Sequence, residues 1–294
     1  MKYATILKYA DEYQIRMMCR ALGVCASSYY HWRKGKASLR ARSRVELDAE
    51  VRAAFESEKA RAGAPRLTRR LKAQGHVAGH NQVAQSLRRQ GLRAKAARKF
   101  KATTNSNHAL PVSPNLLNQD FSAQRCDEKW VSDDRREWFI HITYIDTAEG
   151  WLYLAVVMDV CSRAIVGWSM SQRMTARLTC DALKMAVSRR HRPCGVIVHS
   201  DRGSQYCAQE YRMLLERHGL ISSMSARGNC YDNAAMESWN HSLKVEAVHG
   251  ARFATREEAK KEVFEYIEIY YNRQRMHSAL NYLSPMQFEL SKVA

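Results

Sequence analysis

The sequence lacks long apolar runs. No stretch approaches the ~18 uninterrupted apolar residues that a membrane-spanning helix needs, although 46% of the 294 residues are hydrophobic. The first eight residues, MKYATILK, have neither the apolar core nor the cleavage site of a signal peptide. These absences argue against a membrane protein and predict a cytoplasmic location. A chain of this length has enough residues for two or three small domains.

Paired cysteines are also missing. The eight cysteines are scattered, and no two form the C-x-x-C pattern of zinc and redox motifs. His76 and His80 have zinc-like spacing, but no cysteine pair stands at the matching distance. In a reducing cytosol we therefore expect free thiols, mostly buried as small hydrophobic side chains, and no structural zinc.

Acidic residues are scarce in the first part of the chain. Residues 1–120 carry 24 Lys and Arg against 8 Asp and Glu, whereas residues 121–294 carry 23 against 21. The net charge of +18 is therefore concentrated in the N-terminal part. Because such self-repulsion is costly unless an anion offsets it, we predict that this part binds a polyanion. A solvated basic surface without a partner is the alternative.

The basic part contains two predicted helix-turn-helix segments. In residues 1–42, an amphipathic helix over 12–22 ends at a glycine, and a short aromatic and basic helix follows. An ordinary helical hairpin with Tyr29 and Trp32 in its core explains this first segment equally well.

The second segment, residues 43–101, repeats the arrangement. One apolar face is formed by Val45, Leu47, Val51 and Phe55, and two more helices are indicated by Leu67, Leu71, Val83 and Leu87. The end of this segment is strongly basic, and we expect it to contact DNA through Arg88, Arg89, Arg93, Lys95, Arg98 and Lys99. Residues 102–122 are polar and proline-containing, which predicts a linker.

From residue 123 to residue 290 the pattern becomes α/β. Three antiparallel strands, a helix, a strand-helix-strand unit and a late helix are predicted in that order. This is the order of an RNase H-like fold with a mixed five-stranded sheet. Residues 151–158 are almost continuously apolar, as expected for a central strand. In such a fold, acidic residues from the first strand, the fourth strand and the late helix meet at one place.

Two acidic residues stand at such positions. Asp201 ends an apolar run, and Glu237 lies in a helical segment, with 35 residues between the two acids. Carboxylate oxygens are the ligands that Mg²⁺ prefers, and paired Mg²⁺ ions promote phosphoryl transfer. Lys244 lies two helical turns after Glu237 and can reach a phosphate, although a plain surface lysine is the alternative. Arg202 and Arg227, in the polar segments beside these acids, are further predicted DNA contacts.

These segments together resemble the catalytic core of the DDE integrase and transposase superfamily. The whole chain resembles the second-frame product of a bacterial insertion sequence with two overlapping frames. The resemblance rests on WLYLAVVMD (151–159), HSDRGSQY (199–206), DNAAME (232–237) and YYNRQRMHSAL (270–280), with MCRALGV (18–24) near the start.

The resemblance implies an activity and its partners. It implies cleavage at the 3′ ends of element DNA and strand transfer into target DNA, with two Mg²⁺ (or Mn²⁺) ions per site. The implied partners are double-stranded DNA, as terminal inverted repeats and target, and other copies of the chain in a homo-oligomer. An upstream-frame helix-turn-helix protein is often a partner or fusion. The implied location is the bacterial nucleoid.

One segment departs from the family pattern. Relatives carry the first catalytic acid in a strand that reads Trp-x-x-Asp-Ile-Thr-Tyr, whereas here eight residues (134–141) separate Asp133 from Ile142. In one alignment Asp133 is the acid and the eight residues bulge out. In the other, residues 138–144 form an unbroken strand and His141, a poor Mg²⁺ ligand, takes the place of the acid.

The first alignment gives Asp133, Asp201 and Glu237 as the catalytic and metal-binding set. The second would make the chain a catalytically impaired relic or a regulatory DNA-binding protein that keeps the basic N-terminal part. We take the first alignment as the prediction and keep the second as its alternative.

Overall fold

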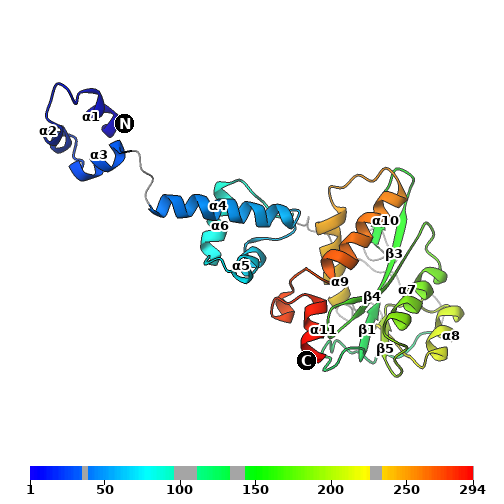
Figure 1. The fold of residues 1–294 in the computed structure, drawn as a ribbon. Helices are drawn as coiled ribbons and strands as arrows, with labels where there is room; N and C mark the ends of the chain where they lie inside the picture. The colour runs from blue at the N-terminus through cyan, green and yellow to red at the C-terminus, as the bar shows by residue number, and fades with distance from the viewer. Residues whose placement is uncertain (35–38, 96–110, 133–142, 226–233, 294) are drawn as a thin grey trace. The chain divides into compact units, whose positions relative to one another are not determined.

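The computed structural model describes residues 1–34, 39–95, 111–132, 143–225 and 234–293. The chain divides into two compact units, Met1–Arg93 and Ala94–Ala294, each considered by itself (Figure 1). None of the helices in the described ranges combines the length and apolarity required to cross a bilayer.

The first group of helices in the N-terminal unit has a very small core. It comprises α1 (Lys2–Lys8), α2 (Ile15–Ala21) and α3 (Ala26–Arg33). Ile6, Cys19 and Tyr29 are buried together, one from each helix. Trp32 is 43% exposed, so only Tyr29 meets the expectation of an aromatic core.

The second group comprises α4 (Leu39–Ser57), α5 (Ala64–Ala73) and α6 (His80–Arg89). Four predicted apolar residues are buried between these helices: Leu67, Leu71, Val83 and Leu87. On α4, Val51 and Phe55 are buried, but Val45 is 69% exposed, contrary to the predicted face. Helix length explains the difference, because α4 spans roughly 28 Å and its two partners only about 15 Å each.

The C-terminal unit is built on a mixed sheet. Its strands are β1 (Lys129–Ser132), β2 (Thr143–Ile145), β3 (Leu152–Asp159), β4 (Ile165–Ser171), β5 (Ile197–Ser200) and β6 (Ile221–Met224). β5 is parallel to β1 and to β6, and the remaining pairs are antiparallel. The predicted five-stranded sheet has six strands, because β1 and β2 share one edge of β3 while β4 pairs along the other.

β1 and β2 pair with the same edge of β3, but their registers differ by eight residues. Ser132 of β1 pairs with Val157, so an uninterrupted antiparallel strand would place residue 135 opposite Leu154. Thr143 pairs with Leu154 instead, eight positions later in the sequence. β1 pairs with residues 157–159 of β3. The segment on which the two alignments differ, 133–142, lies outside the described residues, and Asp133 and His141 lie outside them with it.

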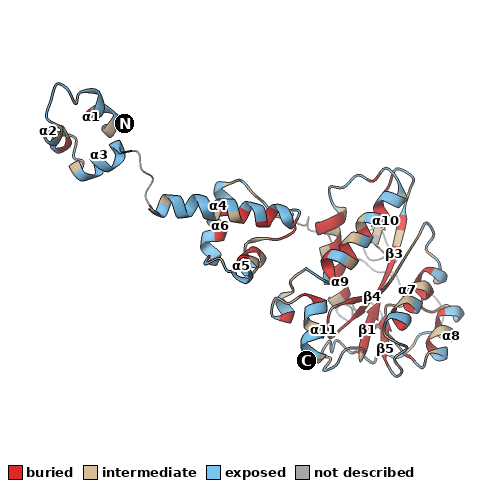
Figure 2. Ribbon diagram, viewed as in Figure 1, coloured by how far each residue is buried: buried red, intermediate tan, exposed pale blue. Residues whose placement is uncertain are grey.

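Helices cover both faces of the sheet. One face packs against α7 (Ala176–Arg189) and α8 (Gln209–Arg217), and the other against α9 (Ala234–Leu243), α10 (Arg256–Phe264) and the π-helical turns η2 (Lys244–Val248) and η3 (Glu265–Tyr271). A short 3₁₀ turn, η4 (Ser278–Leu280), and α11 (Pro285–Val293) complete the unit. Residues of β3 alternate between the two cores, which explains its continuous apolarity. Figure 2 shows the sheet strands coloured largely as buried. Thr175 is the N-cap of α7, but its side chain makes no capping hydrogen bond.

Gly167 allows α7 to approach β4 closely. A Cβ atom at this position would lie 2.2 Å from the carbonyl oxygen of Ala182 and 2.8 Å from the Cβ of Ala186. Because both neighbours belong to the helix, the helix would have to move as a body. We expect Gly167→Ala to lower the free energy of unfolding by about 1–3 kcal/mol or more, measured by urea denaturation.

Gly63→Ala is the matched control for this variant. Its added Cβ would meet only the ring of Pro65, at 3.9 Å. Gly63 is the N-cap of α5, so the change should cost a few tenths of a kcal/mol up to roughly 1. Equal effects of the two substitutions would contradict the close approach of α7 to β4.

Candidate functional site

Two strands and one helix that carry or adjoin predicted site residues are neighbours in the C-terminal unit. In the parallel pair β1–β5, Trp130 faces Val198 and Val131 faces His199, so each β1 residue pairs with the residue 68 positions later. The two strands therefore end at the same edge, and Asp201 directly follows β5. Helix α9, which carries Glu237 in its first turn, packs against β1.

Asp201 directly follows the C-terminal end of β5, which hydrogen bonds hold in place. Its side chain is almost completely buried, and Oδ1 accepts a hydrogen bond from the amide of Gly203 at 2.9 Å. The preceding His199 is fully buried, with its ring nitrogens 2.8 Å and 3.2 Å from the hydroxyls of Ser223 and Ser225. These contacts fix the end of β5, so the Asp201 carboxylate is held in place by the sheet.

Glu237 and Lys244 lie along one unbroken helix. Both side chains are half-buried, and Lys244, the first residue of η2, follows Glu237 of α9 by seven residues, about two helical turns. At Lys244 the helix widens into the π-helical turn η2, a local geometry that is frequent at functional sites. The role of Lys244 as a phosphate contact stays a prediction, supported by its helical spacing from Glu237.

The remaining predicted DNA contacts differ in their surroundings. Arg88 and Arg93 are exposed. The Arg89 guanidinium instead binds the Asp48 carboxylate at 2.6 Å and holds the pKa of Asp48 below its ordinary value. Lys95 donates to the main-chain oxygen of Glu246 at 3.0 Å. Three more predicted site residues, Arg98, Lys99 and Arg227, fall outside the described residues.

Arg202 also has an internal partner. Its Nε donates to the main-chain oxygen of Ser225 at 2.8 Å, and its side chain is half-buried. Arg202 thus ties the segment after β5 to the end of β6. Arg202 therefore stabilises this part of the fold, in addition to its predicted contact with DNA.

A buried ion pair behind α9 was not foreseen from the sequence. The Nε and Nη2 atoms of Arg275 donate to the two carboxylate oxygens of Glu246, each at 2.9 Å. Nη2 also donates to the hydroxyl of Ser242, and the hydroxyl of Tyr266 donates to Glu246 at 3.0 Å. Arg275 belongs to the YYNRQRMHSAL motif, so the sequence marked this residue as important. The motif alone does not show that Glu246 is the partner of Arg275.

The same motif makes two further contacts. The Asn272 side chain pairs with both main-chain groups of Ile165, at 2.9 Å and 3.0 Å, and so secures the start of β4. The ring of His277 packs edge-on against Tyr271 at 5.0 Å. The motif therefore connects the sheet to the helix that carries Glu237 and Lys244.

We expect Glu246→Ala to lower the free energy of unfolding by about 3–5 kcal/mol, because it leaves the Arg275 charge buried without its partner. The Arg275 side chain is only 12% exposed. Chemical denaturation measures the loss. The control is Asp181→Ala, which removes an exposed partner of Arg177 and Lys184 and should cost no more than about 1 kcal/mol. Similar losses in both variants would rule out a special role for the buried pair.

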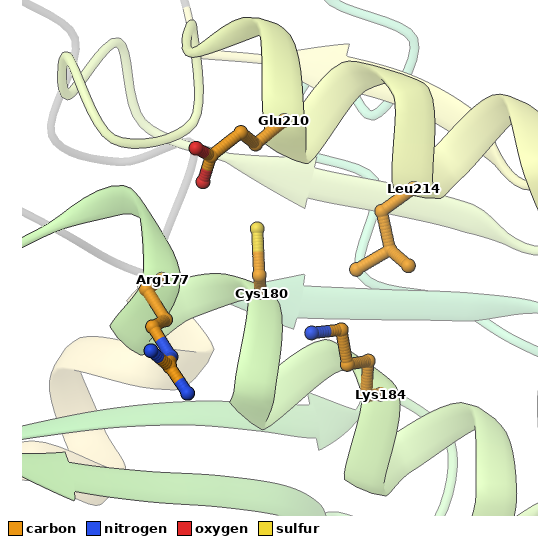
Figure 3. Close-up of a pocket in the computed structure, with 5 residues that line it drawn as sticks. All are labelled: Arg177, Cys180, Lys184, Glu210 and Leu214. Atoms are coloured by element: carbon orange, nitrogen blue, oxygen red, sulfur yellow. The ribbon is translucent and has the colours of Figure 1, made fainter.

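A hollow of about 350 Å³ lies between α7 and α8 (Figure 3). It is lined by Arg177, Cys180, Lys184, Glu210 and Leu214, with the thiol of Cys180 pointing between the charged side chains. Burial raises the pKa of Cys180, so this thiol stays protonated near neutral pH. None of the predicted site residues lines this hollow, and it is distinct from the carboxylate edge of the sheet.

Family models match most of the chain. Residues 134–230 and 237–292 match two models described as "Integrase core domain", and residues 41–100 match one described as "HTH-like domain". The transposase InsF of insertion sequence IS3A from Escherichia coli (strain K12) is 54% identical over 296 residues, covering 100% of both chains. An uncharacterized 31 kDa protein of insertion element IS600 from Shigella sonnei is 46% identical and covers 92% of this chain and 97% of its own.

Solved viral integrase structures are more distant. The HTLV-2 integrase catalytic core in complex with magnesium is 14% identical, with a TM-score of 0.42, over 57% of this chain and 99% of its own. A chain of the simian T-cell lymphotropic virus intasome in complex with PP2A regulatory subunit B56 gamma is 16% identical, with a TM-score of 0.44. The match covers 80% of this chain and 73% of the intasome chain.

Proposed function

The chain belongs to the family of IS3-type insertion-sequence transposases, and we propose that it cuts the 3′ ends of its element and joins them to target DNA. The observation that carries this proposal is the edge where β1 and β5 end in parallel, with Asp201 after β5 and α9 packed on β1. The RNase H-like core supplies the polynucleotidyl transferase machinery, and the basic helical unit supplies DNA binding.

Asp133, Asp201 and Glu237 are the proposed catalytic and metal-binding carboxylates. The donor set fits Mg²⁺ or Mn²⁺, because both take hard oxygen ligands and the buried Asp201 carboxylate is already oriented by the Gly203 amide. Two such ions, when bound, would activate the attacking oxygen and stabilise the leaving oxygen. The strand end keeps Asp201 rigid, while Glu237 sits on a helix and Lys244 can neutralise a phosphate on the same side of that helix.

The register supports Asp133 as the first acid. β1 residues pair with β5 residues 68 positions later, and the same offset matches sequence position 133 with position 201. For His141 the same offset would match position 209, which is not the position of the second acid. If the eight extra residues nevertheless disable the site, the alternative function is that of a regulatory DNA-binding protein or relic.

The proposed partners follow from this function. They are double-stranded DNA, as inverted repeats and target, further copies of the same chain, and an upstream-frame helix-turn-helix protein as a separate or fused partner. A protein that acts on chromosomal DNA would work at the bacterial nucleoid.

A strand-transfer assay tests the function. The full-length chain is incubated with Mg²⁺, a duplex that carries the terminal inverted repeat of its element, and a target plasmid. The expected result is a product that joins the 3′ end of the duplex to the plasmid, formed only with the divalent cation. DNA binding without any joined product would favour the regulatory alternative, and a lack of both binding and joining would contradict the proposal.

Exposed basic residues should set the salt dependence of DNA binding. We expect Arg88→Ala and Arg93→Ala each to lower the slope of log K against log salt by about 1, because each loses one phosphate contact. Fluorescence anisotropy at several salt concentrations measures this slope. Arg89→Ala is the matched control, because Arg89 is paired with Asp48. An unchanged slope in both exposed variants would contradict their proposed contacts.

A further inference from the structure

Two cysteines and an aspartate meet at the opposite end of β1 from the carboxylate edge. Cys126 precedes β1, Asp159 is the last residue of β3, and Cys161 lies in the turn between β3 and β4. Both Sγ atoms and a carboxylate oxygen of Asp159 lie within 4.8 Å of one another. Asp159 pairs with Trp130, which is level with Val198 of β5, so Asp201 lies three residues, or roughly 10 Å, further along the strands.

These three side chains form a donor set unlike that of the Mg²⁺ site. Mg²⁺ takes oxygen ligands, whereas two sulfur donors with one carboxylate suit Zn²⁺. In a tetrahedral Zn²⁺ site, ligand atoms stand roughly 3.6–3.8 Å apart, given the usual Zn–S and Zn–O distances. Ligand atoms within 4.8 Å of one another can reach this spacing by small side-chain rotations.

The Asp159 carboxylate is already fixed in position. It is fully buried, and Oδ1 accepts hydrogen bonds from the amide and the hydroxyl of Ser162, at 2.7 Å and 2.9 Å. Oδ2 accepts a single hydrogen bond, from the amide of Asp127 at 2.7 Å, and so keeps one lone pair for a cation. Such outer contacts orient a metal ligand and strengthen binding.

The two thiols are reduced and partly accessible. Both side chains are half-buried, so a solvated ion can reach them. Burial raises the pKa of Cys126 to about 12 and also raises that of Cys161. A coordinating cation removes the protons of its thiol ligands on binding.

The surrounding charges also allow a cation. Arg190 and Lys292 are the nearby positive groups. The guanidinium of Arg190 is engaged by the carboxylate of Glu289 and by that of Asp127, at 3.3 Å from the latter. Asp159 adds a third carboxylate, so these neighbouring groups are net negative. A divalent cation therefore enters a region of net negative charge.

We propose that Cys126, Asp159 and Cys161 bind one Zn²⁺ ion, with water as the fourth ligand. The ion would tie the segment before β1 to the turn between β3 and β4. This site is separate from the proposed Mg²⁺ site and does not depend on strand transfer.

Metal titration of the full-length chain tests the proposal. The protein is purified under reducing conditions, stripped with a chelator and titrated with Co²⁺ and then Zn²⁺ in excess Mg²⁺, which saturates oxygen-only sites. We expect one Co²⁺ per chain with a thiolate charge-transfer absorption band, displaced by one Zn²⁺. Zn²⁺ should also raise the melting temperature, because only the folded chain presents the site.

Single substitutions identify the ligands. Cys126→Ser and Cys161→Ser should each abolish the absorption band and weaken Zn²⁺ binding by at least about 100-fold, since even outer contacts cost 10–100-fold. Cys194→Ser is the control, because Cys194 is an exposed thiol outside the cluster, and it should bind like the parent chain. Melting temperatures without metal confirm that each variant is folded.

Three results would overturn the proposal. They are a parent chain that gives no thiolate–cobalt band, a double variant Cys126→Ser/Cys161→Ser that still binds Zn²⁺ as tightly as the parent, and a disulfide between the two cysteines in the freshly purified protein.

Discussion

Asp201→Asn and Glu237→Gln are each expected to reduce strand transfer by at least about 10³-fold. A bound metal ion contributes several kcal/mol to charge stabilisation, and about 4 kcal/mol corresponds to 10³ in rate. An amide oxygen keeps the shape of the side chain but not the charge that holds the ion. Quantifying joined products on a gel at saturating Mg²⁺ measures the effect, and binding to inverted-repeat DNA should be unchanged.

The control for this prediction is Glu257→Gln. Glu257 is an exposed acid on α10 whose side chain is 71% exposed and pairs with Lys260. Removing its charge should leave strand transfer unaltered. If Asp201→Asn or Glu237→Gln kept more than a tenth of the parent activity, that residue would not be a metal ligand.

Two deletions of equal length decide the first acid. Removing residues 134–141 joins Asp133 to Ile142 and restores Trp-x-x-Asp-Ile-Thr-Tyr, whereas removing residues 133–140 places His141 before Ile142. Each deletion removes eight residues, which is the number of positions by which the registers of β1 and β2 against β3 differ. We expect strand transfer from the first deletion variant and a loss of at least about 10³-fold in the second, because neutral His is a poor Mg²⁺ ligand.

Point substitutions in the full-length chain complete this test. Asp133→Asn should abolish strand transfer, and His141→Ala should leave it intact. A full-length chain without product, beside an active deletion of 134–141, would establish that the extra residues disable this copy. The reverse outcome, with His141→Ala inactive and Asp133→Asn active, would refute the assignment of Asp133.

Local sequence signals predicted most elements of the C-terminal unit. The run at 151–158 became the central strand β3, since a strand covered on both faces must be apolar at consecutive positions. Gly219 ends α8 with a positive φ of 62°, a conformation that glycine adopts without steric cost. These features are encoded within a few residues, and the sequence contains all of them.

Features that depend on partners distant in the sequence were missed. The exposure of Val45 depends on the lengths of α5 and α6, not on the spacing within α4. The cysteines were expected to be mostly buried, but among the described ones only Cys19, Cys180 and Cys207 are. The pairing of Arg275 with Glu246 joins residues 29 apart, because the segment after η3 lies against η2.

The sequence by itself determined the family, the order of the strands and helices, the basic character of the first 120 residues and the identity of the candidate acids. Composition, periodicity and short motifs are local quantities, and one chain is enough to read them. Only the tertiary structure decided which strands are neighbours. It paired β1 with residues 157–159 of β3. It placed Thr143 of β2 opposite Leu154, eight positions later than an uninterrupted strand would do. It also brought Cys126 close to Asp159 and Cys161. Strand pairing and register are fixed only when helices and strands from distant segments together bury both faces of the sheet, because no single segment can do so alone.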